Sequence, residues 1–187
     1  FREKPTSDWH NEMVALLSKI QNDVLSLSYS VPKPSIQAHF KEEKKRKKIY
    51  RPIANYEFYD RLIIGQVSKY LTSCFDPFFL DNSYAFRSTE IVGKSFSHHK
   101  AIEDIIEYKK NHSNNELWVA EADIKKFYDC VDHRVIKEIF SEKVLECNNA
   151  GTQIDKRAIA IFHSYLNSYS FSQDVKTLSL GENREYG

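Results

Sequence analysis

The stretch Val119-Ala-Glu-Ala-Asp-Ile-Lys-Lys-Phe-Tyr-Asp-Cys-Val-Asp-His133 decides how this chain is interpreted. Apolar and small residues open it, and we expect a short buried strand over residues 117–122. Asp123 comes directly after that strand, and Asp132 precedes an amphipathic helix that it is placed to cap. A carboxylate at the end of a buried strand suits a hard cation such as Mg²⁺, which takes oxygen ligands. The stretch therefore predicts a metal-binding residue at Asp123.

The residues around Asp123 extend this interpretation to nucleotide chemistry. Phosphoryl and nucleotidyl transfer often use two divalent ions, which stabilise the attacking and leaving oxygens. Asp123 and the backbone carbonyl of Ile124 would form half of such a site. Tyr128 would lie near the sugar of a nucleotide bound there, where its bulk could sense a 2′-hydroxyl. Asp129 and Asp132 are assigned structural roles first, in a turn and as a helix cap.

A strongly basic hairpin is expected upstream. Residues 36–40 and 48–53 read as its two strands, and residues 41–51 hold seven Lys or Arg against two Glu. One interpretation is a phosphate-gripping finger, because clustered cations bind nucleic acid or a triphosphate. The other is a solvated hairpin tip. Charge alone leaves both open.

Helical periodicity dominates the rest of the chain. We expect helices over residues 8–27, 56–74, 96–108 and 154–168, another one after Asp132, and a hairpin over residues 171–187. The expected fold class is therefore α+β, rich in helix, with a small amount of sheet.

Composition bounds the function. The 187 residues suit one domain or two small subdomains, and 41% hydrophobic with 28% charged residues indicates a globular protein. A net charge of +1 excludes a uniformly basic nucleic-acid binder but not a local basic patch. Three distant cysteines give no zinc or disulfide pattern, which fits a reducing cytosol. No apolar run approaches the roughly 20 residues that span a bilayer, so we expect no membrane contact.

Three motifs together resemble a known family. Asp123-Ile-Lys-Lys-Phe-Tyr-Asp-Cys-Val-Asp-His133 looks like the first catalytic motif of prokaryotic reverse transcriptases: the group II intron, retron and phage-defence enzymes. Tyr50-Arg-Pro-Ile53 with Asp60-Arg-Leu62 looks like that family's first fingers block, and Ser83-Tyr-Ala-Phe-Arg87 like its second. The last two are closer to the intron and defence branches than to retrons. Three motifs in the family's order are far more specific than one.

The resemblance implies a right-hand polymerase fold, with a fingers β-hairpin and the start of an antiparallel palm sheet. Residues 1–34 would be an N-terminal helical extension, residues 35–115 the fingers, and residues 116–187 part of the palm. The implied activity is RNA-directed DNA synthesis by a cytoplasmic bacterial enzyme. Its partners would be an RNA template, a DNA or RNA primer, and dNTPs.

The resemblance also implies roles for individual residues. Asp123 would bind two Mg²⁺ ions with help from the Ile124 carbonyl, and Tyr128 would exclude ribonucleotides. The incoming triphosphate would be held by Arg51 together with one or more of the nearby lysines: Lys44, Lys45, Lys47 and Lys48. Arg87 and Arg61 would contact template or organise the fingers, and for Arg61 a structural ion pair is an equal alternative.

The chain departs from the family in one respect. Such enzymes also need a Pro-Gln-Gly segment and a Tyr/Phe-x-Asp-Asp hairpin, and the 187 residues contain neither. The chain starts at Phe1 and stops at Gly187, and both ends look cut. We therefore expect part of a longer polymerase that is inactive alone, because Asp123 is the only matched catalytic carboxylate.

Two alternatives stay open. One is a non-catalytic nucleic-acid-binding module that retains the polymerase fold, since a fold does not guarantee an activity. The other is a different palm-fold nucleotidyltransferase of the primase type, which the bulk of Tyr128 disfavours. Template, priming mode, oligomeric state and biological setting are not predicted.

Overall fold

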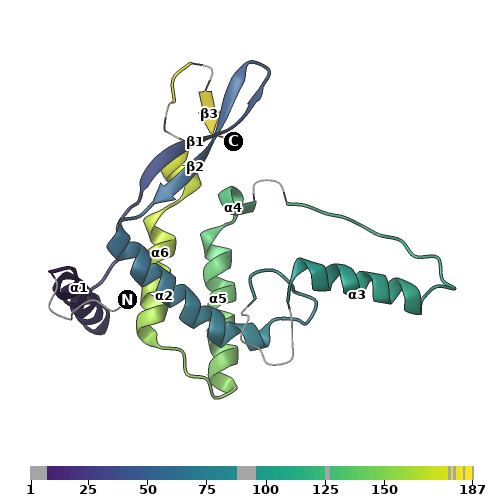
Figure 1. Ribbon diagram of the computed structural model, residues 1–187, viewed down its shortest axis with the longest axis horizontal. Helices are drawn as coiled ribbons and strands as arrows, with labels where there is room; N and C mark the ends of the chain where they lie inside the picture. The colour runs from purple at the N-terminus through teal and green to yellow at the C-terminus, as the bar shows by residue number, and fades with distance from the viewer. Residues whose placement is uncertain are drawn as a thin grey trace. The chain divides into compact units, whose positions relative to one another are not determined.

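The structure is a computed structural model, and it describes residues 8–87, 96–124, 127–176, 178, 180–182 and 184–186. The fold is helix-rich α+β with a small mixed sheet (Figure 1), which confirms the expected class at this level. In chain order the elements are α1 Asp8–Leu25, β1 Ser35–Lys44, β2 Lys47–Asn55, α2 Phe58–Phe75, α3 His98–Asn111, α4 Phe127–Cys130, α5 His133–Asn149, α6 Lys156–Ser168 and β3 Arg184–Tyr186. Two short turns, η1 Asp76–Phe78 and the π-helical η2 Phe171–Val175, complete the list.

The chain divides into two compact units. Unit 1 combines residues 1–68 with 155–187, and unit 2 is residues 69–154. The helix α2 contributes to both. This division differs from the expected boundaries at residues 34 and 115, which follow motifs rather than contacts. None of the described helices is long and apolar enough to cross a membrane.

The core of unit 1 is built from three segments that are distant in the sequence. Val31, Ile63 and Ile161 are buried together. Around them pack partly buried residues from α1, α2 and the connection between them: Ile20, Val24, Tyr29, Tyr56, Tyr59, Ile64 and Val67. Hydrophobic burial at a period of three to four residues along α2 and α6 makes this core possible.

Polar contacts hold the same core in place. The Tyr29 hydroxyl donates to the buried Asp60 carboxylate at 2.8 Å, and the backbone N–H of Val31 donates to Ser164 Oγ at 2.7 Å. Burial, together with the Asp60 carboxylate, raises the pKa of Tyr29. The Tyr29 phenol therefore stays protonated, and can keep donating, to a higher pH than an exposed tyrosine.

The sheet has the order β1-β2-β3 and belongs entirely to unit 1. β1 and β2 are antiparallel, with Phe40 opposite Tyr50 and a bulge between Phe40 and Glu42. The turn consists of Lys45 and Arg46, both with positive φ (51° and 66°). Two consecutive positive φ values are the geometry of a type I′ turn, which matches the twist of a hairpin but strains residues other than Gly, Asn and Asp.

Unit 2 packs α5 against the end of α2. The Phe75 and Phe140 rings meet edge to face at 5.5 Å, and the buried Cys147 thiol donates to the Cys74 carbonyl at 3.6 Å. The start of α5 is capped by Asp132, as expected from the sequence. Its end leads into Gly151 at φ 90°, a conformation that costs glycine nothing.

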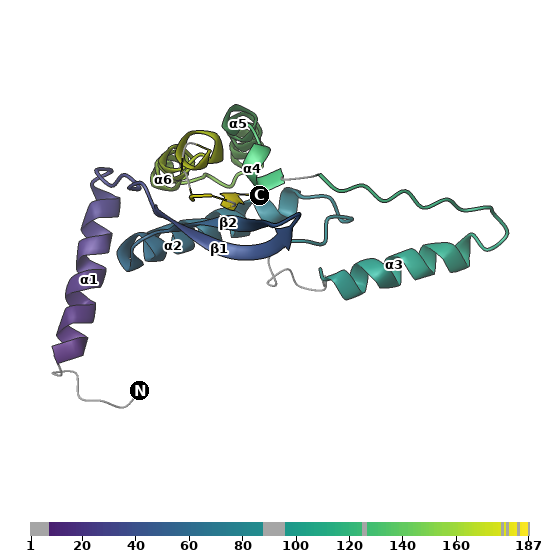
Figure 2. The ribbon, with the colours of Figure 1, turned by 90° about the horizontal axis from the view of Figure 1, so that it is seen from above.

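The strand expected over residues 117–122 was wrong. That segment is extended but belongs to none of the sheets that the described residues form, and Val119 is 90% exposed. In Figure 2 it runs from the end of α3 as a plain trace rather than an arrow. A strand needs a hydrogen-bonded neighbour, and apolar composition alone does not provide one.

The hairpin expected over residues 171–187 was also wrong. Residues 171–175 form η2, and residues 184–186 form β3, which pairs in parallel with Lys48–Tyr50 of β2. Figure 1 shows β3 beside β2. The alternating pattern was read as local pairing, but the partner lies in the first third of the chain.

A candidate nucleotide and nucleic-acid site

Asp123 lies on the exposed extended segment that follows α3. The neighbouring Ile124 is 68% exposed, and its carbonyl accepts a hydrogen bond from the Phe127 N–H at 3.2 Å. That bond starts the turn of α4. A carbonyl oxygen has a second lone pair, so it can still bind a cation. Asp123 and Ile124 are therefore consecutive exposed residues of unit 2 that carry a carboxylate and a carbonyl oxygen.

Carboxylate and carbonyl oxygens are ligands that Mg²⁺ accepts, and Mg²⁺ commonly keeps several of its waters, so these two donors fit that ion in kind. Within the described residues, no group of three or more His, Cys, Asp or Glu side chains gathers that could hold a metal ion.

Asp132 is the other acidic residue of the motif whose side chain the structure describes, and it is engaged elsewhere. Asp132 accepts from the Arg134 N–H at 2.8 Å and pairs with the Arg134 guanidinium at 2.7 Å. These bonds lower the pKa of Asp132 to about 2. Its carboxylate is therefore committed to the helix cap. The side chains of Tyr128 and Asp129 lie outside the described residues, so the expected sugar-sensing role of Tyr128 has no geometry here.

The cations of the hairpin differ in their partners. Lys44 pairs with Glu42 and Lys47 with Glu185, each at 3.0 Å. Lys48 and the turn residue Lys45 are exposed, and neither forms an ion pair with any described residue. The hairpin therefore keeps part of its positive charge available for a ligand.

Arg51 and Lys48 lie on opposite faces of β2, because side chains alternate along a strand. Arg51 is exposed and opposite His39 in the register, whereas Lys48 shares its face with Tyr50. We call the face of the sheet that carries Arg51 the Arg51 face, and the face that carries Lys48, Tyr50 and Phe40 the aromatic face. Lys44 and Lys47 are directly opposite each other and belong to the Arg51 face. The sequence argument combined Arg51 with one or more of these lysines. Lys44 and Lys47 share the face of Arg51, whereas Lys48 projects from the other face.

Arg87 is enclosed within unit 2. Its side chain is 3% exposed and donates from Nε to Asp76 Oδ1 at 2.8 Å. Further bonds reach three carbonyl oxygens, those of Asp76, Leu80 and Ser83, and the guanidinium stacks 3.7 Å from the Phe96 ring centroid. All of these contacts organise the loop that carries Ser83-Tyr-Ala-Phe-Arg87. The geometry thus favours the organising role over a template contact for this residue.

Arg61 is exposed on α2 in unit 1. Its guanidinium carbon lies 5.9 Å from the Phe58 ring centroid, which is a weak contact. Within the part of the chain that the structure describes, Arg61 forms no ion pair.

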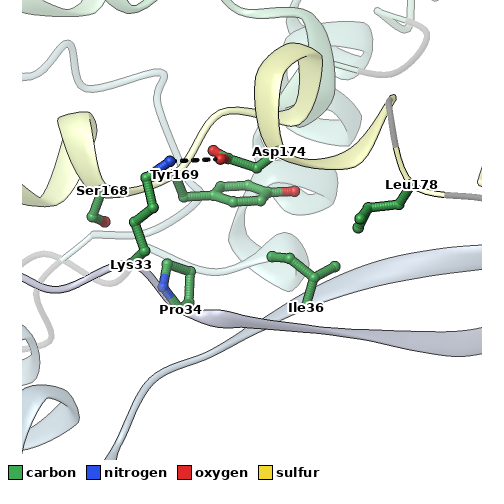
Figure 3. Close-up of a pocket in the computed structure, with 7 residues that line it drawn as sticks. All are labelled: Lys33, Pro34, Ile36, Ser168, Tyr169, Asp174 and Leu178. Carbon is green, nitrogen blue, oxygen red and sulfur yellow. Dashed lines mark hydrogen bonds and ion pairs between the residues drawn. The ribbon is translucent and has the colours of Figure 1, made fainter.

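A pocket of about 320 Å³ lies in unit 1, near the start of β1. Figure 3 shows Lys33 joined to Asp174 at 3.1 Å, with Tyr169 beside them and Ile36 and Leu178 further along. Ile36 belongs to the aromatic face, since it lies two and four positions from Ala38 and Phe40 on β1. Ile36, at the beginning of this face, lines the pocket together with residues that follow α6: Tyr169, Asp174 and Leu178.

Sequence reasoning placed residues 184–186 in a local hairpin and missed their pairing with β2, and so did not identify Arg184, Glu185 and Tyr186 as site residues. Local sequence does not show which strand is the partner. No family model matches the chain, and no match is found among curated proteins. The resemblance to reverse transcriptases therefore rests on the motif residues themselves.

Proposed function

We propose that this chain forms the fingers and part of the palm of an RNA-directed DNA polymerase of the bacterial cytoplasm. The observation that carries the proposal is the eleven-residue motif at 123–133, accompanied by two further motifs in the family's order. The complete enzyme would add dNTPs to a DNA or RNA primer on an RNA template.

The local geometry of the motif is compatible with this role. Asp123 and Ile124 are consecutive exposed residues shortly before α4, and Asp132 caps the start of α5. The Asp123 carboxylate and the Ile124 carbonyl would hold Mg²⁺, which when bound stabilises the charge that develops on the transferred phosphate. The remaining ligands would come from a Tyr/Phe-x-Asp-Asp segment.

The hairpin supports the proposal from a different direction. Lys45 and Arg46 hold positive φ angles that a Gly-containing turn would adopt without strain. Lys45 and Arg46 are strained at these positions, which suggests a functional reason for the two positive charges at the tip. Arg51 on one face of β2 would neutralise an incoming triphosphate.

The decisive experiment is RNA-templated primer extension by the product of the complete reading frame. Asp123→Ala should abolish extension, because a carboxylate that serves both metal ions has no substitute. Asp123→Asn is the isosteric companion and should be equally inactive. Glu121→Ala, two residues away and exposed, is the matched control and should retain activity. Extension by the Asp123→Ala enzyme would refute the proposal.

Sugar selectivity gives a second readout of the same site. Tyr128→Ala should let ribonucleotides enter, and unchanged discrimination between dNTPs and NTPs would remove Tyr128 from the proposal. The 187-residue chain alone should not extend a primer, since Asp123 is its only matched catalytic carboxylate.

A non-catalytic alternative makes a different prediction for the Asp123→Ala variant. A nucleic-acid-binding module derived from the polymerase fold would keep its biological phenotype after Asp123→Ala. Loss of that phenotype would exclude this alternative.

A further inference from the structure

The three strands align their aromatic residues in one row. Phe40 of β1 is opposite Tyr50 of β2, and Tyr50 is paired with Tyr186 of β3. Residues paired across a sheet project from the same face, so all three rings belong to the aromatic face. The sequence places these residues 10 and 136 positions apart, and only the parallel pairing of β3 brings them together (Figure 1).

The row is accessible to a ligand. Phe40 is 59% exposed, and Tyr50 and Tyr186 are partly exposed. The Phe40 and Tyr50 rings meet edge to face, with 5.9 Å between their centroids and an angle of 77° between their planes. The ring that offers its edge keeps both of its faces outside this contact. Tyr169, Asp174 and Leu178 line the pocket at Ile36, four positions before Phe40. The exposure of Phe40 shows that the described residues leave this ring accessible.

A row of cations lies next to the aromatic row, toward the hairpin tip. Lys48 is paired with Arg184 across β2 and β3, so both project from the aromatic face. Both are exposed, and neither forms an ion pair with another described residue. Glu43 is opposite Lys48 and is the acidic member of this row. The turn cations Lys45 and Arg46 follow directly.

Aromatic rings beside cations on a sheet have a specific use. Single-stranded nucleic acid binds to such surfaces by stacking its bases on the rings while the cations contact its phosphates. Duplex nucleic acid offers no free base faces, and an acidic protein segment would use the cations but not a row of ring faces. The combination therefore selects one class of partner.

We infer that the aromatic face is a platform for single-stranded nucleic acid, on which Phe40, Tyr50 and Tyr186 stack successive bases while Lys48 and Arg184 contact the phosphates. The platform lies on the side of β2 opposite to Arg51. It binds without metal or dNTP and without sequence preference. In a polymerase it would hold unpaired template, but its binding does not depend on the proposed activity.

The test measures fluorescence anisotropy of labelled 12-nucleotide dT and U strands with the 187-residue chain in EDTA. Phe40→Ala should weaken binding of these strands roughly tenfold, the effect of losing one stacked base. Phe40→Leu should weaken it similarly because it keeps apolar area but has no ring, whereas Phe40→Trp should preserve binding. Comparing the dT and U strands reveals any preference for DNA or RNA.

Matched controls separate stacking from general damage. Ile53 is 43% exposed on the Arg51 face of the same hairpin, so Ile53→Ala should leave affinity within about twofold. Arg184→Gln should lower the slope of log affinity against log salt by about 0.7, the value for one phosphate of a single strand. Lys69→Gln, an exposed cation on α2, should leave the slope unchanged.

Several outcomes overturn the inference: no binding by the wild-type chain, unchanged binding by Phe40→Ala, or equal losses for Phe40→Ala and Ile53→Ala. Full affinity in Phe40→Leu would rule out stacking. If size-exclusion chromatography shows a dimer that Phe40→Ala separates while the wild type binds no strand, the face is a contact between copies. Asp123→Ala should bind normally here, so failure of the polymerase proposal and failure of this one are distinguishable.

Discussion

The Arg87 side chain has a structural role, because its charge is paired and buried. Its ion pair with Asp76 is almost completely buried, with side-chain exposures of 3% and 1%. Arg87→Ala would leave the Asp76 carboxylate buried without this cation, and breaking such a pair costs roughly 3–5 kcal/mol. We expect that loss in the free energy of unfolding of unit 2, measured by urea denaturation.

Two further variants sharpen this test. Arg87→Lys should recover only part of the loss, because an ammonium cannot reproduce the bonds that the guanidinium makes to Asp76, Leu80 and Ser83. Arg134→Ala removes an ion pair that lies at the surface, where such pairs contribute little, and should barely change stability. Equal effects of Arg87→Ala and Arg134→Ala would contradict the structural role of Arg87.

The Asp155 carboxylate makes the stability of the folded chain depend on pH in the acid range. The Arg157 side chain and then the Arg157 backbone N–H lower the pKa of Asp155 from 3.8 to about 2. A depressed pKa in the folded state stabilises the protein above pH 4, and this contribution is lost as the pH falls toward 2. Asp155→Asn keeps the helix cap but removes the charge.

We therefore expect a smaller drop in Tm between pH 5 and pH 2.5 for Asp155→Asn than for the wild-type chain, measured by circular dichroism. Asp132 would supply part of the remaining slope, since its pKa is also lowered to about 2. Glu12→Gln, at an exposed position of α1, is the control and should keep the wild-type drop. An unchanged slope in Asp155→Asn would show that Arg157 does not hold this carboxylate in solution.

At the scale of elements, the hairpin tip carries a prediction about strain. Replacing Lys45-Arg46 by Asn-Gly should raise the stability of the hairpin by about 1 kcal/mol, because Asn-Gly suits a type I′ turn. The same change removes two exposed cations and should weaken nucleic-acid binding. Thermal unfolding and the anisotropy assay measure the two effects.

A Gln-Gln turn separates charge from conformation. It removes the same two cations without relieving the positive φ angles, so it should weaken binding and leave stability near the wild-type value. If Asn-Gly failed to stabilise the chain, the type I′ conformation would not be the one populated in solution.

Elements with a local signal were predictable from the sequence. Helical periodicity located α1, α2, α3, α5 and α6, and alternation located β1 and β2. Elements whose existence depends on a distant partner were not. Residues 117–122 look like a strand but have no described neighbour. The segment of β3 was read as part of a local hairpin, whereas its partner is Lys48–Tyr50. The cap at Asp132 was predictable because capping is local, whereas the pairing of Arg87 with Asp76 was not.

At the scale of the whole molecule, unit 1 is discontinuous in the sequence. The core of unit 1 combines residues 8–68 with residues from 155–187. Ile161 of α6 belongs to this core, and only 4% of it is exposed. Ile161→Ala should cost roughly 2–5 kcal/mol through lost burial and the cavity left behind. Amide hydrogen exchange should then accelerate in β1 and β2 of unit 1.

The α5 helix provides an internal reference for this hydrogen-exchange measurement. Exchange in α5, which belongs to unit 2, should change much less than exchange in the sheet. Equal acceleration in α5 and in the sheet would mean that the two units unfold together.

The late pairing of β3 affects how the chain is made. Lys47 and its partner Glu185 are 138 positions apart. A ribosome adding about 5–20 residues per second would complete the hairpin on the order of ten seconds before β3 emerges. During that interval the nascent chain exposes one edge of β2 with no strand to cover it. The lysines along that strand discourage other chains from pairing there, so the charges that suit a ligand also protect an unfinished protein from aggregation.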